Sequence, residues 1–144
     1  MAANTSPIFS LTPKIGFAKV TGVDGSADGI DADVKLVHTA GSFGGFVQKL
    51  YAQPISTSGS TTTSAAVLRI YVNNGSTVGT ATNNQLIKEW SLSAIAVNVA
   101  ATVGVLSYEI PLNFQLPASY TIYAGVTAMA ANTQWNITAV AGDY

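Results

Sequence analysis

The chain has 144 residues, and only 9% of them are charged, six Lys and Arg against seven Asp and Glu. An ordinary soluble domain has about 25% charged residues. Here 48% of the residues are apolar and the mean hydropathy is +0.34, which excludes a disordered chain. A net charge of −1 with scattered basic residues argues against nucleic-acid binding. The absence of cysteine excludes a disulfide framework, a thiolate metal site and a Cys nucleophile.

The length predicts a single domain. The first residues carry neither a basic segment nor an apolar run of the kind found in secretion signals. The longest stretch of low polarity, residues 94–106, is interrupted by polar residues and is shorter than the roughly 20 apolar residues of a membrane helix. We therefore expect synthesis in the cytoplasm and no membrane partner.

Residues 1–13 differ from the rest of the chain and predict an N-terminal arm, followed by one β domain over residues 14–144. The arm contains two prolines and a small apolar set, Ile8, Phe9 and Leu11. One interpretation is a first edge strand or a frayed tail. The other is an arm that docks on a neighbouring subunit, with Ile8, Phe9 and Leu11 as the candidate interface residues.

Alternation of apolar and polar residues, rather than helical periodicity, recurs along the remaining chain. It predicts eight strands, near residues 14–22, 31–39, 45–53, 66–73, 85–92, 105–112, 120–129 and 135–141. Turn-forming residues separate them, including two Asp-Gly pairs before residue 30 and Asn-Gly at residues 74–75. Eight short strands favour an all-β, eight-stranded β-sandwich, with a jelly roll as the first choice and an immunoglobulin-like sandwich as the second.

The segment 24–33 holds four of the seven acidic residues. Asp24, Ser26 and Asp28 match the first half of a calcium loop, but Lys35 occupies the twelfth position, where a bidentate Glu is required. A polar hairpin loop whose Asp-Gly pairs form turns is the favoured interpretation. We predict no metal and no cofactor, and calcium at this loop remains the alternative.

Catalytic chemistry has few candidates. His38 is the only histidine, and no Gly-x-Ser-x-Gly elbow marks a nucleophile, so a satisfied or exposed histidine at a strand end is expected. Glu89 and Glu109 are the only glutamates, and a glycosidase needs two carboxyls flanking one bond. Both occupy positions that alternation places toward solvent, which favours two surface charges and no catalytic residues.

The aromatic residues could form a sugar-binding platform, although most aromatics in a sandwich belong to the core or to subunit contacts. Alternation places Tyr71 and Tyr123 toward solvent. These two are therefore the candidate exposed binding aromatics.

Four short segments resemble a family of small tailed-bacteriophage virion proteins encoded among the head and tail genes. They are the opening MAANTSPIF, the Thr39-Ala40-Gly41 turn that leads to Gly45, the run LRIYV at 68–72 with the following Asn-Asn-Gly, and LPASY at 116–120 together with the closing Gly-Asp-Tyr. The acidic loop with its four Asp residues departs from the family pattern. The resemblance covers most of the chain and contains no catalytic signature.

The resemblance implies a structural virion protein. The favoured form is a capsid decoration (cement) protein, a homotrimer that binds the phage major capsid protein on the outer face of the shell. Such a protein would be located on the virion. The alternative is a tail- or fibre-associated protein or a carbohydrate-binding adhesin. An enzyme is the least favoured, because no acid, base, nucleophile or metal set stands out.

Overall fold

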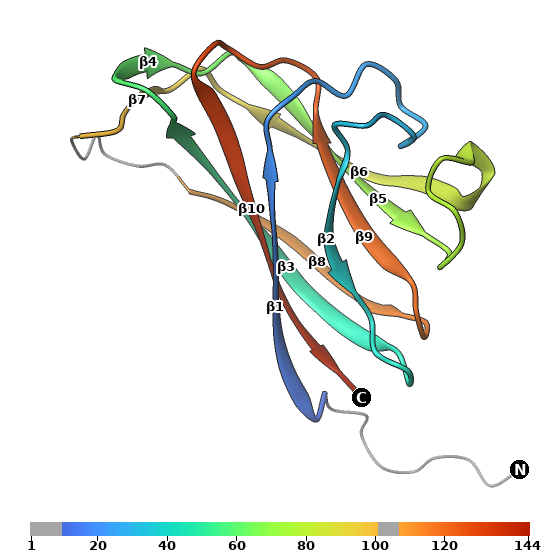
Figure 1. The fold of residues 1–144 in the computed structure, drawn as a ribbon. Helices are drawn as coiled ribbons and strands as arrows, with labels where there is room; N and C mark the ends of the chain where they lie inside the picture. Colours follow the sequence, from blue (N-terminus) through green and yellow to red (C-terminus); the bar gives the residue numbers. More distant parts are fainter. Residues whose placement is uncertain (1–9, 101–106) are drawn as a thin grey trace, which may run out of the picture.

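The computed structural model describes residues 10–100 and 107–144, and these fold into antiparallel β-sheets (Figure 1). One four-stranded sheet, here sheet A, has the order β1 (Thr12–Val20), β10 (Thr133–Asp143), β3 (Gly45–Ser56), β8 (Tyr108–Leu116). The other, sheet B, has the order β2 (Lys35–Thr39), β9 (Thr121–Val126), β5 (Ala66–Asn73), β6 (Asn84–Leu92). A two-stranded sheet joins β4 (Ser60–Thr62) to β7 (Ala96–Asn98), and a single 3₁₀ turn, η1 (Ala81–Asn83), precedes β6.

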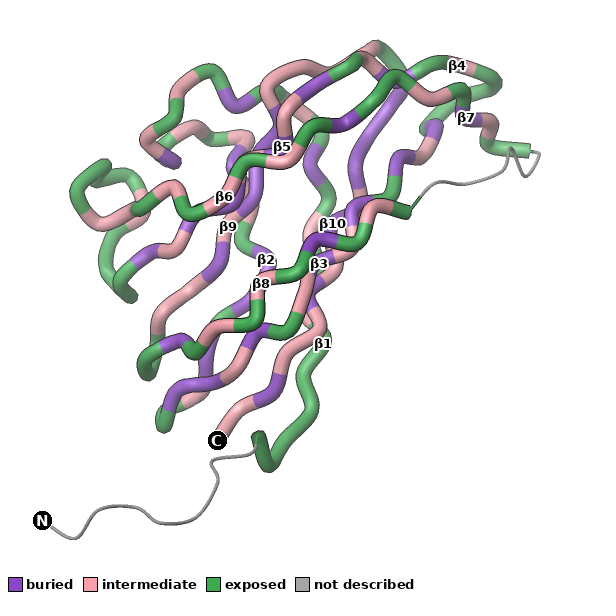
Figure 2. Tube along the Cα trace, turned by 180° about the vertical axis from the view of Figure 1, so that it is seen from behind, coloured by how far each residue is buried: buried purple, intermediate pink, exposed green. Residues whose placement is uncertain are grey.

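Each large sheet has one apolar face, and the two apolar faces share one core. Sheet A contributes Leu50 and Ile137, and sheet B contributes Leu68 and Ile122, all four with no exposed surface. Trp135 of β10 is also buried, and its ring lies 6.0 Å from that of Tyr108. The exposed residues gather in the loops and along much of β1 (Figure 2). The alternating pattern therefore works as expected, with one face of each strand inward.

Each of the eight predicted strands has a counterpart among the described residues, and β5 has the predicted bounds. The other seven differ from their predicted bounds by one to four residues at one or both ends. β2 begins at Lys35 rather than near residue 31, because residues 31–34 form a turn. β1 begins at Thr12, inside the expected arm, where Thr12 and Pro13 pair with Asp143 and Gly142. The sixth strand was expected from residue 105, which lies outside the described residues.

The sequence analysis did not predict β4 and β7. β4 lies in a Ser/Thr-rich stretch whose composition is typical of a loop. Both strands have only three residues, too few to show an alternating pattern. They pair only with each other, at one end of the molecule (Figure 1).

The edge strand β1 closes one side between the two sheets. It pairs with β10 alone, yet it approaches β2 so closely that a Cβ at Gly16 would overlap the backbone carbonyl oxygen of Val37. Gly16 and Ala18 face inward, and no larger side chain fits at Gly16. The larger residues between them, Ile15 and Phe17, consequently point outward.

Candidate functional site

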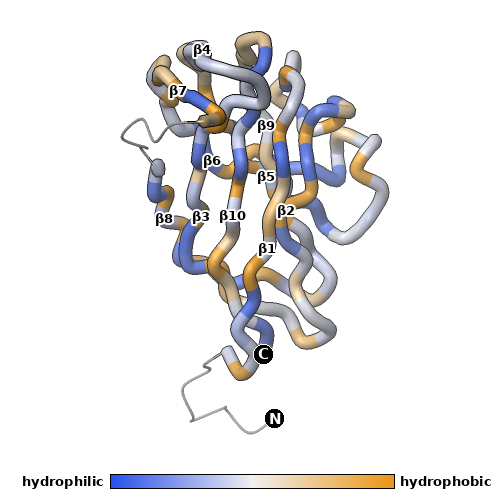
Figure 3. Tube along the Cα trace, turned by 60° about the vertical axis from the view of Figure 1, so that its left-hand side comes forward, coloured by the Kyte–Doolittle hydropathy of each residue, from blue (hydrophilic) through white to orange (hydrophobic). Residues whose placement is uncertain are grey.

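Apolar side chains form an exposed row on β1. Leu11, just before the strand, is 83% exposed, and Ile15 and Phe17 are 71% and 76% exposed. Ile15 and Phe17 are two residues apart in β1, which places them on the same, outer face of sheet A, and we call these two residues together with Leu11 the β1 stripe. Figure 3, which turns β1 toward the viewer, shows apolar segments along this strand. Of the predicted interface residues, Leu11 is exposed, whereas Ile8 and Phe9 lie outside the described residues.

The expectation that Tyr71 is exposed is wrong. Alternation correctly places its ring on the outer face of sheet B, where it pairs across strands with Tyr123. However, the loop of residues 21–34 folds over this face and leaves Tyr71 only 1% exposed. Its hydroxyl donates to Asp24 Oδ2 at 2.6 Å and to the Ser26 carbonyl at 3.2 Å, and Gly29 packs against the ring. Tyr123 is half-buried, so neither tyrosine forms a fully exposed platform.

Asp24 is the central residue of this covering loop. Its backbone N–H donates to the Val126 carbonyl at 2.7 Å, and its carboxylate lies 3.7 Å from the Arg69 guanidinium. Burial raises the pKa of Asp24, although the Tyr71 hydroxyl and the Arg69 charge favour the ionised form. Asp24 Oδ1 is buried without a hydrogen-bond partner among the described residues. The arrangement holds the loop on the sheet.

The other loop carboxylates organise turns. Asp31 accepts hydrogen bonds from the backbone N–H groups of Gly25 and Ser26 at 2.7 and 3.0 Å. The Ser26 hydroxyl and the Ile30 N–H donate to Asp28, and these bonds lower its pKa. Over residues 10–100 and 107–144, no three His, Cys, Asp or Glu side chains are grouped so that they could hold a metal ion. The bond from Ile30 to Asp28 forms an Asx turn, whereas Asp31 ties the start of the loop to its end.

The remaining chemical candidates each have their own surroundings. His38 was expected either to be exposed at a strand end or to have its hydrogen bonds satisfied. It is instead only 6% exposed, and its Nε2 has no hydrogen-bond partner in the described part of the chain. Burial lowers its pKa, against an opposing effect of the Asp143 carboxylate. Glu89 on sheet B pairs with Arg69, and Glu109 on sheet A pairs with Lys49. The two glutamates therefore lie on different sheets and each has its own ion pair.

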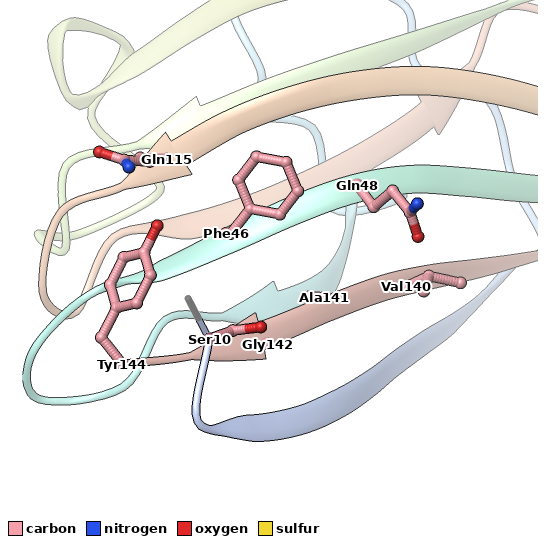
Figure 4. Close-up of a pocket in the computed structure, with 8 residues that line it drawn as sticks. All are labelled: Ser10, Phe46, Gln48, Gln115, Val140, Ala141, Gly142 and Tyr144. Carbon is pink, nitrogen blue, oxygen red and sulfur yellow. The ribbon is translucent and has the colours of Figure 1, made fainter. Parts of the chain in front are cut away.

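A pocket of about 440 Å³ opens on sheet A near the C-terminus, at a place that the sequence analysis did not single out (Figure 4). It is built from three neighbouring strands and the chain end, and its lining consists of Ser10, Phe46, Gln48, Gln115, Val140, Ala141, Gly142 and Tyr144. All eight are uncharged. Phe46, Gly142 and Gln115 share one register row across β3, β10 and β8, so they reach the same face.

Comparisons of the chain with protein-family models, with curated proteins and with solved structures found no match. Within residues 10–100 and 107–144, no helix is long and apolar enough to cross a membrane.

Proposed function

We propose that the chain is a non-enzymatic structural protein of a bacteriophage virion, a capsid decoration protein that binds the outer shell as a homotrimer. The observation that carries this proposal is the β1 stripe, in which Leu11, Ile15 and Phe17 are each at least 71% exposed. Large apolar side chains exposed together along one strand are typical of an interaction site. The resemblance to small virion proteins suggests that neighbouring proteins of a virion cover this surface.

The proposed architecture is a jelly roll. In sheet A the first of the eight principal strands, β1, pairs with the last, β10, and β3 pairs with β8. In sheet B, β2 pairs with β9, and β5 pairs with β6. Folding a long antiparallel hairpin over on itself gives this nesting of early strands with late ones, distributed over two sheets, as in an eight-stranded jelly roll.

We assign Ile15 and Phe17 to the contact with a second copy of the chain. Burying a large apolar side chain contributes about 1.5–3 kcal/mol, so burial of both residues in each subunit offsets part of the entropic cost of association. The contact uses the face of β1 rather than its edge, because Pro13 has no N–H to donate and Lys14 and Lys19 discourage strand addition. A face contact joins subunits without extending a sheet.

Leu11 and the preceding arm, with Ile8 and Phe9, form the proposed anchor on the shell. Copies that bind only the assembled shell stabilise it by mass action. We expect deletion of residues 2–11 to reduce co-sedimentation with empty shells of the phage that encodes the protein. Unchanged occupancy would remove the arm from the proposal.

The oligomer is tested by sedimentation equilibrium of the wild-type chain and of Phe17→Ser. The matched control is Phe43→Ser, because Phe43 lies in the turn between β2 and β3 and is 81% exposed. We expect a trimeric wild type, an unchanged control and an association at least about tenfold weaker for Phe17→Ser, which corresponds to about 1.4 kcal/mol. A wild-type monomer, or equal effects of both substitutions, would contradict the proposal.

A further inference from the structure

The pocket on sheet A has a composition that the proposed assembly role does not use. Its polar groups are the carboxamides of Gln48 and Gln115 and the hydroxyls of Ser10 and Tyr144, and its rings are those of Phe46 and Tyr144. Among the described residues, the side chains of Gln48, Gln115 and Tyr144 form no hydrogen bond with the protein. These donors and acceptors are therefore available to a ligand. Figure 4 shows them distributed around the space above β3 and β10, with Tyr144 at the chain end.

The backbone around the pocket is irregular in a way that exposes Gln48. On β3, Val47 pairs with Ala141 and Lys49 pairs with Val140, which leaves Gln48 between them without a partner on β10. The register with β8 shifts at the same residue, and Asn113 of β8 adopts a positive φ of 53°. Bulges of this type re-aim a side chain and are common beside binding sites. Here the bulge brings Gln48 to the pocket rim.

The lining chemistry limits the class of ligand. Sites for phosphate or carboxylate commonly use Lys, Arg or a helix N-terminus, and sites for divalent cations commonly use carboxylate side chains. The lining side chains include no Lys, Arg, Asp or Glu. An apolar side chain of a second copy would leave the carboxamides and hydroxyls buried without partners, which is unfavourable. The lining side chains therefore favour a ligand that is neutral, hydroxyl-rich on its edges and apolar on a face.

We propose that this pocket is a binding site for a neutral saccharide. Each Gln carboxamide offers two N–H donors and one carbonyl acceptor, which match hydroxyl groups that both donate and accept. The rings of Phe46 and Tyr144 provide apolar surface for the C–H face of a sugar ring, and Tyr144 adds a hydroxyl. The volume of about 440 Å³ falls within the range of about 300–1,000 Å³ for small-molecule sites. This inference does not rest on the proposed assembly role.

The first experiment screens the full chain on an array of neutral oligosaccharides of hexose, deoxyhexose and N-acetylhexosamine units, with sialylated and uronate-containing glycans on the same array. We expect binding to one or more neutral glycans. No binding at all, or binding restricted to acidic glycans, would overturn the proposal. The oligomeric state of the same preparation, measured by sedimentation equilibrium, reports on the assembly role separately.

The second experiment locates the site by titrating the best neutral glycan into ¹⁵N-labelled protein. We expect chemical-shift changes at the side-chain amides of Gln48 and Gln115, and affinity about tenfold or more weaker for Gln115→Ala and Tyr144→Ala, as loss of hydrogen bonds and ring contact implies. The matched control is Gln53→Ala, an exposed glutamine farther along β3 that is not part of the pocket lining. Equal affinity of all variants, or shift changes elsewhere only, would refute the assignment.

Discussion

The hydroxyl of Tyr71 is expected to hold the loop of residues 21–34 on sheet B, and Tyr71→Phe removes that hydroxyl alone. It donates to Asp24 Oδ2 at 2.6 Å and to the Ser26 carbonyl at 3.2 Å. A hydrogen bond to a charged group contributes about 1.5–3 kcal/mol. Because Asp24 is 1% exposed and its Oδ1 already lacks a partner in the described part of the chain, water cannot readily replace the lost donor. We therefore expect a loss of about 2 kcal/mol in the free energy of unfolding.

The assay is urea denaturation followed by tryptophan fluorescence, at one protein concentration because association shifts apparent stability. A chain of this length loses roughly 3 °C of melting temperature per kcal/mol, so thermal unfolding should show a decrease of about 6 °C. Tyr123→Phe is the control, since Tyr123 is the cross-strand neighbour of Tyr71 but is only half-buried. We expect it to lie within about 0.5 kcal/mol of the wild type.

A double-mutant cycle with Asp24→Asn tests the pair itself. Residues that share a hydrogen bond show non-additive effects of about 0.5–3 kcal/mol. Additive effects of Asp24→Asn and Tyr71→Phe would refute the reasoning, as would a Tyr71→Phe protein as stable as the Tyr123→Phe control. Hydrogen exchange of the Asp24 amide, which donates to Val126, would show whether the loss is confined to local opening of the loop.

Two further predictions concern β1 and the buried carboxylate. Gly16→Ala should lower the free energy of unfolding by about 3 kcal/mol, because the new Cβ would overlap a backbone carbonyl oxygen of β2. The control is Gly79→Ala, which has open space around it and should change the free energy of unfolding by no more than about 0.5 kcal/mol. Similar effects at both sites would contradict the close approach of β1 to β2. Burial raises the folded-state pKa of Asp24 above its usual value of 3.8, so the folded state holds this proton more tightly and the contribution of Asp24 is most favourable at acidic pH. The stability of the wild type relative to Asp24→Asn should therefore fall as pH rises from about 3 to about 7, and a rise measured by urea denaturation over this range would contradict that sign.

The strands could be predicted from the sequence because each sheet has one buried face, which imposes a period of two on the residues. In β5, Leu68 and Ile70 face the core as the pattern indicates. The same pattern does not specify what covers the other face. Tyr71 points away from the core as expected, yet it is buried by a loop more than 40 residues earlier in the chain. Its burial is a tertiary contact that no local periodicity contains.

β1 illustrates a second limit of alternation. Its residues alternate between small and large, and a rule that apolar residues point inward would bury Ile15 and Phe17. The close approach to β2 reverses this arrangement at Gly16, where a Cβ would overlap the Val37 carbonyl oxygen, and Ile15 and Phe17 lie on the outer side. The small residues in the alternate positions are the signal that could have indicated an outward apolar face. This signal depends on knowing which strand lies opposite.

The pocket on sheet A could not be predicted from any single segment. Gln48, Gln115 and Tyr144 come from two strands and the chain end, and they meet because β8 and β10 flank β3. The bulge at Gln48 is not visible in the sequence, where residues 45–53 alternate as an ordinary strand would. Register and sheet order therefore determine this site, and both are long-range properties.

Most of the few charged residues have partners within the chain. Ion pairs join Lys14 to Asp143, Lys35 to Asp33, Lys49 to Glu109, and Arg69 to both Asp24 and Glu89. Lys88 donates to the Pro111 carbonyl, while Asp28 and Asp31 accept hydrogen bonds within their own loop. Most of the few charges are thus satisfied inside the molecule, and the β1 stripe and the pocket offer apolar, amide and hydroxyl groups instead. Because the net charge is only −1 and the charged residues are few, long-range electrostatic steering is weak, and recognition at either surface depends mainly on shape, apolar burial and short-range hydrogen bonds.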